Sequence, residues 1–273
     1  MCPDLPDLAA TCCIPYESSA YADALSVALE AALTAGGYAY AERENLQQVE
    51  ARTAHDVKLV LDSTCQKLAE AVLRKSFPDH QIMGEEGGTL DGGADWLWII
   101  DPLDGTVNYF NRIPHWCSAI ALRERGRVVV GVVFAPMTGE CFTATLDGPA
   151  CLNGVPIRVS STDSLRDACM LTGLSAILED PDDRMGRLKS ILGDTSKIRV
   201  LGASALDHCY VAAGRADGLF EYALHVWDMA AGGLILERAG GRFEKVYKQS
   251  DLVCGSLGSN SLLHDPLRKL FVE

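Results

Sequence analysis

The sequence is short of positive charge. Lys and Arg together number 24 against 37 Asp and Glu residues, which gives a formal net charge of −13 over 273 residues. A nucleic-acid or anionic-membrane surface needs clustered Lys and Arg to release counterions, so this balance argues against both partners. An acidic chain that binds phosphate would need a local source of positive charge, and a bound metal ion is one such source.

Segments that direct a chain to or across a membrane are also missing. No stretch of the sequence reaches the ~18 apolar residues that a membrane span requires. The first residues, Met1-Cys2-Pro3-Asp4-Leu5-Pro6, lack the basic region and the long apolar core of a signal peptide. We therefore expect a cytoplasmic protein with no membrane partner.

The 10 cysteines include no CxxC pair, so the sequence lacks the spacing of a zinc cluster. Most of them lie in apolar stretches such as residues 116–120. We expect buried thiols that behave as small hydrophobic residues in a reducing compartment.

What the sequence does contain is ordinary globular material, 48% hydrophobic and 22% charged. Helical periodicity predicts helices within residues 18–45, with an interruption near Gly36-Gly37, and over 60–76. Short apolar runs predict strands at 81–83, 96–100, 118–122, 128–134 and 141–144. The unalternating run at 128–133 indicates a strand that is covered on both faces.

After about residue 160, strands and helices alternate. The expected strands are 168–172, 198–201 and 218–222, and the expected helices are 203–214, 227–239 and 261–271. Such alternation is typical of an α/β layer. The sequence therefore predicts an α+β half over 1–160, which carries the main metal-binding motif, and an α/β half over 161–273, which closes the active site.

The segment from Trp98 to Asn108 carries the chemistry. An apolar strand leads directly into Asp101 and Asp104, and the carbonyl group of Leu103 lies between them. These oxygens are a hard ligand set that suits Mg²⁺. The same pattern is also a good turn between strands, so alone it leaves both interpretations open.

Gly105 and Thr106, directly after this pair, offer backbone N–H groups to a phosphate oxygen. Two acids elsewhere in the chain strengthen the metal interpretation. Glu85 follows a short strand upstream, and Asp228 stands at an expected helix start, where an Asp is ordinarily a cap. Together with the first pair, these acids make four carboxylates, which are too many to bury together without cations.

With these motifs, in this order, the chain resembles the inositol monophosphatase family of the lithium-sensitive, metal-dependent phosphatase superfamily. The resemblance rests on residues 84–86, 98–108 and 227–241 and covers roughly 20–265. It implies a layered α-β-α-β-α sandwich of the sugar-phosphatase type. It also implies two or three Mg²⁺ per site, a small phosphorylated substrate and a homodimer.

Family membership would assign the metal ligands residue by residue. Glu85, Asp101 and the Leu103 carbonyl are implied to hold a first Mg²⁺. Asp101, Asp104 and Asp228 are implied to hold a second.

The resemblance also implies catalytic and substrate-binding roles. Asp62 would orient Thr106, which together with Glu85 positions the attacking water; a solvated helix residue is the plain alternative for Asp62. Lys58 and Leu59 depart from the family pattern beside it. The residues implied to bind substrate are Asp104, Gly105, Thr106, Ala203, Ser204, Glu221 and Asp228. For Glu221, the alternative is a surface charge at a strand end, and for Ser204 it is a helix cap.

The expected activity is Mg²⁺-dependent hydrolysis of a small phosphomonoester, with inositol monophosphate favoured. Fructose-1,6-bisphosphatase is an alternative on the same fold. A 3′(2′),5′-bisphosphate nucleotidase is less favoured because such relatives are often longer around the motifs, and histidinol phosphatases usually lack a Trp at the position of Trp227. A non-catalytic binding or regulatory relative is the alternative of a different class, and the complete ligand set argues against it.

Overall fold

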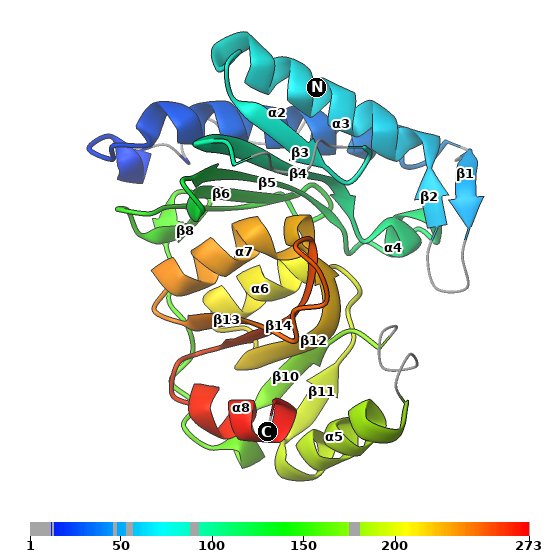
Figure 1. The fold of residues 1–273 in the computed structure, drawn as a ribbon, viewed down its shortest axis with the longest axis vertical. Helices are drawn as coiled ribbons and strands as arrows, with labels where there is room; N and C mark the ends of the chain where they lie inside the picture. The colour runs from blue at the N-terminus through cyan, green and yellow to red at the C-terminus, as the bar shows by residue number, and fades with distance from the viewer. Residues whose placement is uncertain are drawn as a thin grey trace.

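Layers of helices and sheets alternate through the molecule, as the computed structural model shows (Figure 1). It describes residue 12 and residues 14–45, 48–52, 57–87, 93–174 and 181–272. Helices α2 (Ala22–Glu42) and α3 (Val60–Ser76) cover one face of a seven-stranded sheet, and α6 (Ser204–Ala212) and α7 (Val226–Arg238) lie between that sheet and a five-stranded sheet. Helices α5 (Pro181–Asp194) and α8 (His264–Phe271) cover the outer face of the smaller sheet. This order matches the predicted α-β-α-β-α sandwich.

The larger sheet has the strand order β3-β4-β5-β6-β7-β8-β9. Only the β3–β4 pair is parallel among its described pairings. Its strands are β3 Gln81–Gly84, β4 Trp96–Asp104, β5 Cys117–Glu124, β6 Arg127–Ala135, β7 Glu140–Thr145, β8 Ala150–Leu152 and β9 Val155–Pro156.

The smaller sheet has the strand order β11-β10-β12-β14-β13. Strand β10 pairs in parallel with β11 and β12, whereas β14 pairs antiparallel with β12 and β13. Its strands are β10 Cys169–Thr172, β11 Lys197–Arg199, β12 Gly218–His225, β13 Arg242–Val246 and β14 Val253–Ser259. Strands β1 Val49–Arg52 and β2 Val57–Leu59 form a separate antiparallel pair.

The helices are α2 Ala22–Glu42, α3 Val60–Ser76, α4 Thr106–Phe110, α5 Pro181–Asp194, α6 Ser204–Ala212, α7 Val226–Arg238 and α8 His264–Phe271, with short 3₁₀ turns at Ile14–Tyr16 and Leu165–Asp167. None of the described helices is both long and apolar enough to cross a membrane. The strands of the two sheets come from separate stretches of the chain, 81–156 and 169–259. A domain boundary near residue 160 stays a prediction.

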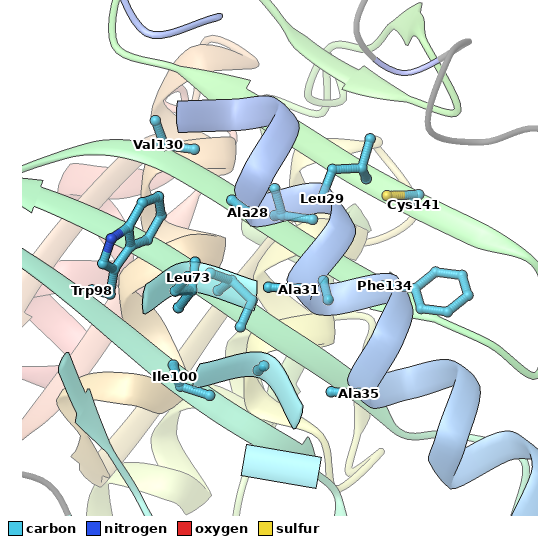
Figure 2. Packing of buried hydrophobic residues seen from close by; sticks show 14 of the residues in the cluster. Ala28, Leu29, Ala31, Ala35, Leu73, Trp98, Ile100, Val130, Phe134 and Cys141 are labelled. Atoms are coloured by element: carbon cyan, nitrogen blue, oxygen red, sulfur yellow. The ribbon is translucent and has the colours of Figure 1, made fainter. Parts of the chain in front are cut away.

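Alternation along β4 builds two cores from one strand. Trp98 and Ile100 pack with Ala28 of α2 in the core above the larger sheet (Figure 2). Leu97 and Ile99 point to the opposite face, into the core that α6 and α7 share. Strand β6 likewise packs against α2 on one side and α7 on the other, so the prediction of a strand covered on both faces is confirmed.

The described cysteines are all free thiols, and all except Cys169 are buried. Their placement in the apolar cores agrees with the prediction that they act as small hydrophobic residues. Cys2 and Cys13 lie outside the described residues.

The predicted interruption of the first helix is wrong. Helix α2 runs unbroken through Gly36 and Gly37. A Cβ atom at Gly36 would lie 2.8 Å from Cδ1 of the buried Phe134 on β6, so the glycine lets the helix approach the sheet closely. Close packing, and not helix termination, accounts for this glycine.

The two glycines predict opposite effects of an added methyl group. At Gly37 no atom lies within 4 Å of the added Cβ, so Gly37→Ala should stabilise the fold by about 0.5–1 kcal/mol through helix propensity. Gly36→Ala should destabilise it by about 1–3 kcal/mol, because Phe134 must shift in a packed core. Urea denaturation of both variants checks this pair. Equal stabilities would contradict the close approach of α2 to β6.

Candidate active site

A bulge at the end of β4 places Asp101 and Asp104. Side chains of a regular strand alternate between faces, so residues three apart would point to opposite sides. Asp101 pairs with Ala119 and Asp104 with Cys117, so β4 contains one residue more than β5 over this interval. The extra residue of such a bulge allows both carboxylates to turn to the same side of the sheet.

Asp101 is the most strongly perturbed acid at this strand end. Its side chain is buried, with 2% exposed, and its Oδ1 accepts a hydrogen bond of 3.2 Å from the Leu103 N–H group. Burial raises the pKa of Asp101 well above its usual value, and the charges of Glu85, Asp104 and Asp228 raise it further. Acids from three separate segments of the chain therefore act on one carboxyl group.

Asp104 joins the larger sheet to the start of α6. Its Oδ1 accepts the N–H group of Ser204 at 3.1 Å, and its Oδ2 accepts that of Ala205 at 2.8 Å. The thiol of Cys117 lies 3.5 Å from Oδ2. Burial raises the pKa of Asp104, and these donors lower it in part. Each carboxylate oxygen has two lone pairs, so these contacts leave room for a further ligand.

Asp228 lies in the first turn of α7. Its Oδ2 accepts the N–H group of His225 at 2.8 Å, so the helix cap that the sequence offered as an alternative is present. Burial, followed by the charges of Asp104 and Glu85, raises its pKa well above the usual value. Asp228 therefore caps α7 and also belongs, with Glu85, Asp101 and Asp104, to one set of interacting acids, called the acidic group below. The ring of His225 stacks on Trp227 beside it.

The turn after Asp104 depends on a glycine. Gly105 has φ +87°, and a Cβ atom there would lie 3.1 Å from the His115 carbonyl oxygen and 3.2 Å from that of Gly202. Only glycine combines this backbone conformation with such close neighbours at low energy. The next residue, Thr106, donates its hydroxyl hydrogen to the Leu103 carbonyl oxygen at 2.9 Å. Thr106, a predicted catalytic residue, thus holds the carbonyl group of Leu103, which is a predicted metal ligand.

Asp62 is not the solvated helix residue that was the alternative. It has 3% of its surface exposed, in the first turn of α3, and its Oδ2 accepts the N–H group of Leu59 at 2.8 Å. Its proposed action on Thr106 stays a prediction.

Glu85 lies in the turn after β3, and its own N–H group donates to the Ile100 carbonyl of β4 at 3.3 Å. The neighbouring Glu86 fixes this turn. Its nearly buried carboxylate lies 2.7 Å from Nζ of Lys58 and accepts the Ser63 hydroxyl at 3.1 Å. The departure at Lys58 therefore supplies an ion pair that holds the turn of Glu85.

Glu221 is not the surface charge that was its alternative either. It lies on β12 with 8% exposed, and the Ser204 hydroxyl donates to its Oε1 at 3.0 Å. Burial, and then the charges of Asp207 and Asp104, raise the pKa of Glu221 to about 8. The neighbouring Ala203, at the N-cap of α6, is buried. The substrate residues predicted on α6 and β12 therefore touch one another.

Two supporting residues escaped the sequence analysis. The Asn108 amide donates to the carbonyl oxygens of His115 and Leu201, both at 2.8 Å, and so connects the two sheets beside the site. His208 is buried, and burial lowers its pKa to about 4. Its neutral ring lies with Nδ1 2.7 Å from the Ser204 carbonyl oxygen. Asn108 stands inside the quoted motif, but one of its partners, Leu201, lies more than ninety residues away in the chain.

The chemistry of the acidic group fits a divalent cation. Within the described ranges, no three His, Cys, Asp or Glu side chains are already arranged around one point as metal ligands. Glu85, Asp101, Asp104 and Asp228 nevertheless act on one another's ionisation in a buried region, and their oxygens are the donors that Mg²⁺ prefers. A cation would offset both the burial and the mutual repulsion that raise these pKa values. The ligand assignment stays a prediction.

Comparison with known proteins gives the family. The model of the inositol monophosphatase family matches residues 21–269. The chain belongs to the inositol monophosphatase family. Among solved structures of similar fold are an IMPase of Thermotoga maritima (TM-score 0.82, 32% identity, 91% of this chain and 96% of that chain) and the extragenic suppressor protein suhB of Bartonella henselae (TM-score 0.85, 30% identity, 92% and 99%). The predicted family and layered fold are confirmed.

Curated relatives within this family carry a different name. A protein of Pseudomonas aeruginosa, 42% identical over 225 residues (80% of this chain, 83% of the relative), is named Nus factor SuhB. The protein of the same name in Escherichia coli K12 is 38% identical over 221 residues (80% and 83%). These relatives are named as Nus factors. The prediction that the chain has no nucleic-acid partner, which rested on its net charge, is therefore not supported.

Proposed function

We propose that this member of the inositol monophosphatase family is a Mg²⁺-dependent phosphatase. It would release inorganic phosphate from a small phosphorylated polyol, with inositol monophosphate as the favoured substrate. The observation that carries the proposal is the buried Asp101, whose ionisation is opposed by Glu85, Asp104 and Asp228. Such a group is stable as a set of carboxylates only beside cations.

The ligands would divide as the family implies. Glu85, Asp101 and the Leu103 carbonyl would hold one ion, and Asp101, Asp104 and Asp228 a second. Bound Mg²⁺ supplies charge neutralisation for a phosphate dianion and lowers the pKa of water.

The chain's own residues would orient the reactants. Thr106, held against Leu103, and Glu85, held by its fixed turn, would align the attacking water, and Asp62 would support Thr106. The backbone N–H groups of Gly105 and Thr106 would donate to a phosphate oxygen. Catalysis would then rest on positioning and electrostatics.

The alcohol would lie against α6 and β12. Ala203 and Ser204 begin α6, and Glu221 contacts Ser204. With a pKa of about 8, the Glu221 carboxyl group is mostly protonated at neutral pH, so it can both donate to and accept from substrate hydroxyl groups. The charges of Asp104 and Glu221 both act on Asp228, so we expect Asp104 and Asp228 to lie on the side of the site where the alcohol binds. A polyol suits this lining better than an apolar alcohol.

A non-catalytic partner role is the second candidate, favoured by the relatives named Nus factor SuhB. It does not need the acidic group, so the two roles can coexist in one chain. We also propose a cytoplasmic homodimer, as the family resemblance implies.

A phosphate-release assay tests the catalytic proposal. We expect Mg²⁺-dependent release, with kcat/KM highest for inositol 1-phosphate in a panel with fructose 1,6-bisphosphate, adenosine 3′,5′-bisphosphate and histidinol phosphate. Preference for fructose 1,6-bisphosphate or adenosine 3′,5′-bisphosphate would move the assignment to that alternative. No release from any ester, by a folded protein saturated with Mg²⁺, would leave the partner role as the function.

A further inference from the structure

An open cleft lies at the end of α7 that is remote from Asp228. Its volume is about 490 Å³, and residues from the end of α7, the start of β6, β13 and the start of α8 line it. Pockets for small ligands are commonly about 300–1,000 Å³, so the cleft has a suitable size. Asp228 and Arg238 are ten positions apart on the same helix, which at about 1.5 Å per residue separates the cleft from the proposed active site by about 15 Å.

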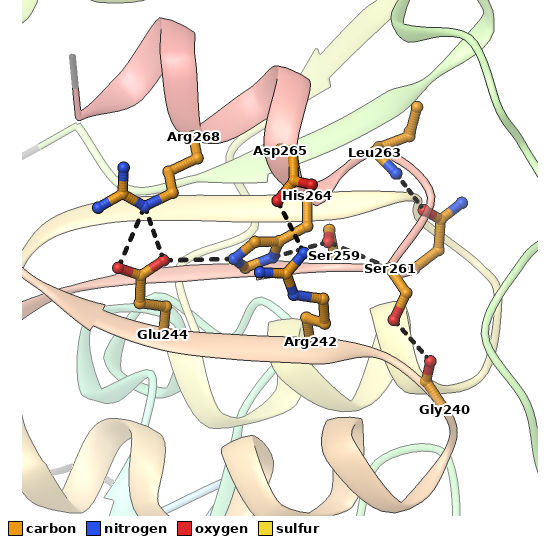
Figure 3. A network of polar contacts seen from close by, with 10 residues as sticks. Gly240, Arg242, Glu244, Ser259, Ser261, Leu263, His264, Asp265 and Arg268 are labelled. Carbon is orange, nitrogen blue, oxygen red and sulfur yellow. Dashed lines mark hydrogen bonds and ion pairs between the residues drawn. The ribbon is translucent and has the colours of Figure 1, made fainter.

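Three arginines line this cleft: Arg127, Arg238 and Arg242. The charge of Arg242 is already compensated, because its Nη1 lies 2.7 Å from Oδ1 of Asp265 (Figure 3). One acid of the lining, Glu244, is compensated in the same way by Arg268, at 3.1 Å, and contacts His264 (Figure 3). These internal pairs form one wall and leave no net charge for a ligand.

Arg127 and Arg238 differ from that wall. In the part of the chain that the structure describes, no carboxylate lies within ion-pair distance of either guanidinium group. The Nε of Arg238 donates to the Gly148 carbonyl oxygen at 2.7 Å, which orients the guanidinium group and leaves its charge intact. Glu237 is the remaining acid of the lining; partial burial raises its pKa, and the charges of Arg127 and Arg238 lower it, so Glu237 can offset only one of these two arginines. The cleft therefore keeps a net positive charge in a chain whose overall charge is −13.

We propose that this cleft is a second ligand site, which binds the phosphate group of a small molecule through Arg127 and Arg238. Guanidinium groups present several donors in a fixed plane and pair well with phosphate oxygens. Phe243 and Leu146 line the same cleft and offer apolar atoms to the rest of the ligand. The site is separate from the acidic group and does not depend on the proposed catalytic function.

Calorimetric titration of the metal-free protein in EDTA tests the site. EDTA removes any Mg²⁺ that could bind the anion at the acidic group, and the paired variants below assign the remaining anion binding to the cleft. The probes are inorganic phosphate and phenyl phosphate, which carry the same dianion without and with an apolar group. We expect both to bind, with phenyl phosphate tighter because it also contacts Phe243. Equal affinities would overturn the proposed apolar contact with Phe243 and restrict the ligand to free phosphate.

The decisive variant is Arg127→Gln combined with Arg238→Gln, which should weaken binding by about tenfold or more through loss of two charge-assisted contacts. The matched control is Arg166→Gln combined with Arg199→Gln. It removes the same charge from two exposed positions outside the cleft and should leave affinity within about twofold. Both variants alter exposed side chains, and equal melting temperatures verify their folding. Absence of binding to the wild type, or equal losses in both variants, would overturn the proposal.

Discussion

Asp101→Asn is expected to abolish most phosphatase activity while the protein stays folded. Asp101 is the one side chain assigned to both metal ions, so its loss should lower kcat/KM by about 10³-fold or more. The substitution keeps the size of the side chain and removes a charge that Glu85, Asp104 and Asp228 oppose. Steady-state phosphate release, together with Mg²⁺ binding by calorimetry, measures the effect.

Asp217→Asn is the matched control for a buried acid outside the site. Asp217 has 8% exposed, and its oxygens accept the Ser160 hydroxyl at 2.6 Å and the Cys169 N–H group at 2.7 Å. This variant should lose stability and keep its turnover per folded molecule. Asp101→Asn should show the reverse: in EDTA it should unfold no more easily than the wild type. Near-normal turnover in a folded Asp101→Asn protein would refute the metal assignment.

The backbone that carries Asp101 and Asp104 depends on local sequence. Asp101, Leu103, Asp104 and Gly105 lie within five positions of the chain, so a strand, a bulge and a positive φ angle set the backbone there, and their roles as ligands stay a prediction. Helix α3 was likewise predicted at its observed bounds, because its apolar positions repeat with helical period.

Properties that arise from distant packing could not be derived in this way. The break predicted at Gly36 failed because the decisive neighbour, Phe134, lies on β6 almost a hundred residues away. Glu221 was assigned a substrate role by resemblance, but its burial and raised pKa come from β12 packing against the start of α6. Strands β13 and β14 were missed, since β14 carries little alternation: it is buried along almost its whole length.

The raised pKa values also predict how the stability of the metal-free protein depends on pH. Glu221 has a pKa of about 8 in the folded protein against a usual 4.5, and the pKa values of Asp101 and Asp228 are raised as well. Between the two values the unfolded chain is ionised and the folded chain retains its protons. Folding therefore binds protons, and stability in EDTA should fall as the pH rises from about 4.5 through 8.

Added Mg²⁺ should reverse this trend, because it binds the ionised carboxylates of the folded state and so stabilises that state more at higher pH. Urea denaturation at about pH 5.5, 7 and 8.5, with EDTA and with saturating Mg²⁺, measures both slopes. Glu221→Gln should make the EDTA slope shallower, since it removes one of the raised groups, and the Mg²⁺ stabilisation should persist because Glu221 is not an assigned ligand. A stability in EDTA that rises with pH would show that the pKa values of these acids are not raised in the folded protein. The argument for a cation at Asp101 would then fail with it.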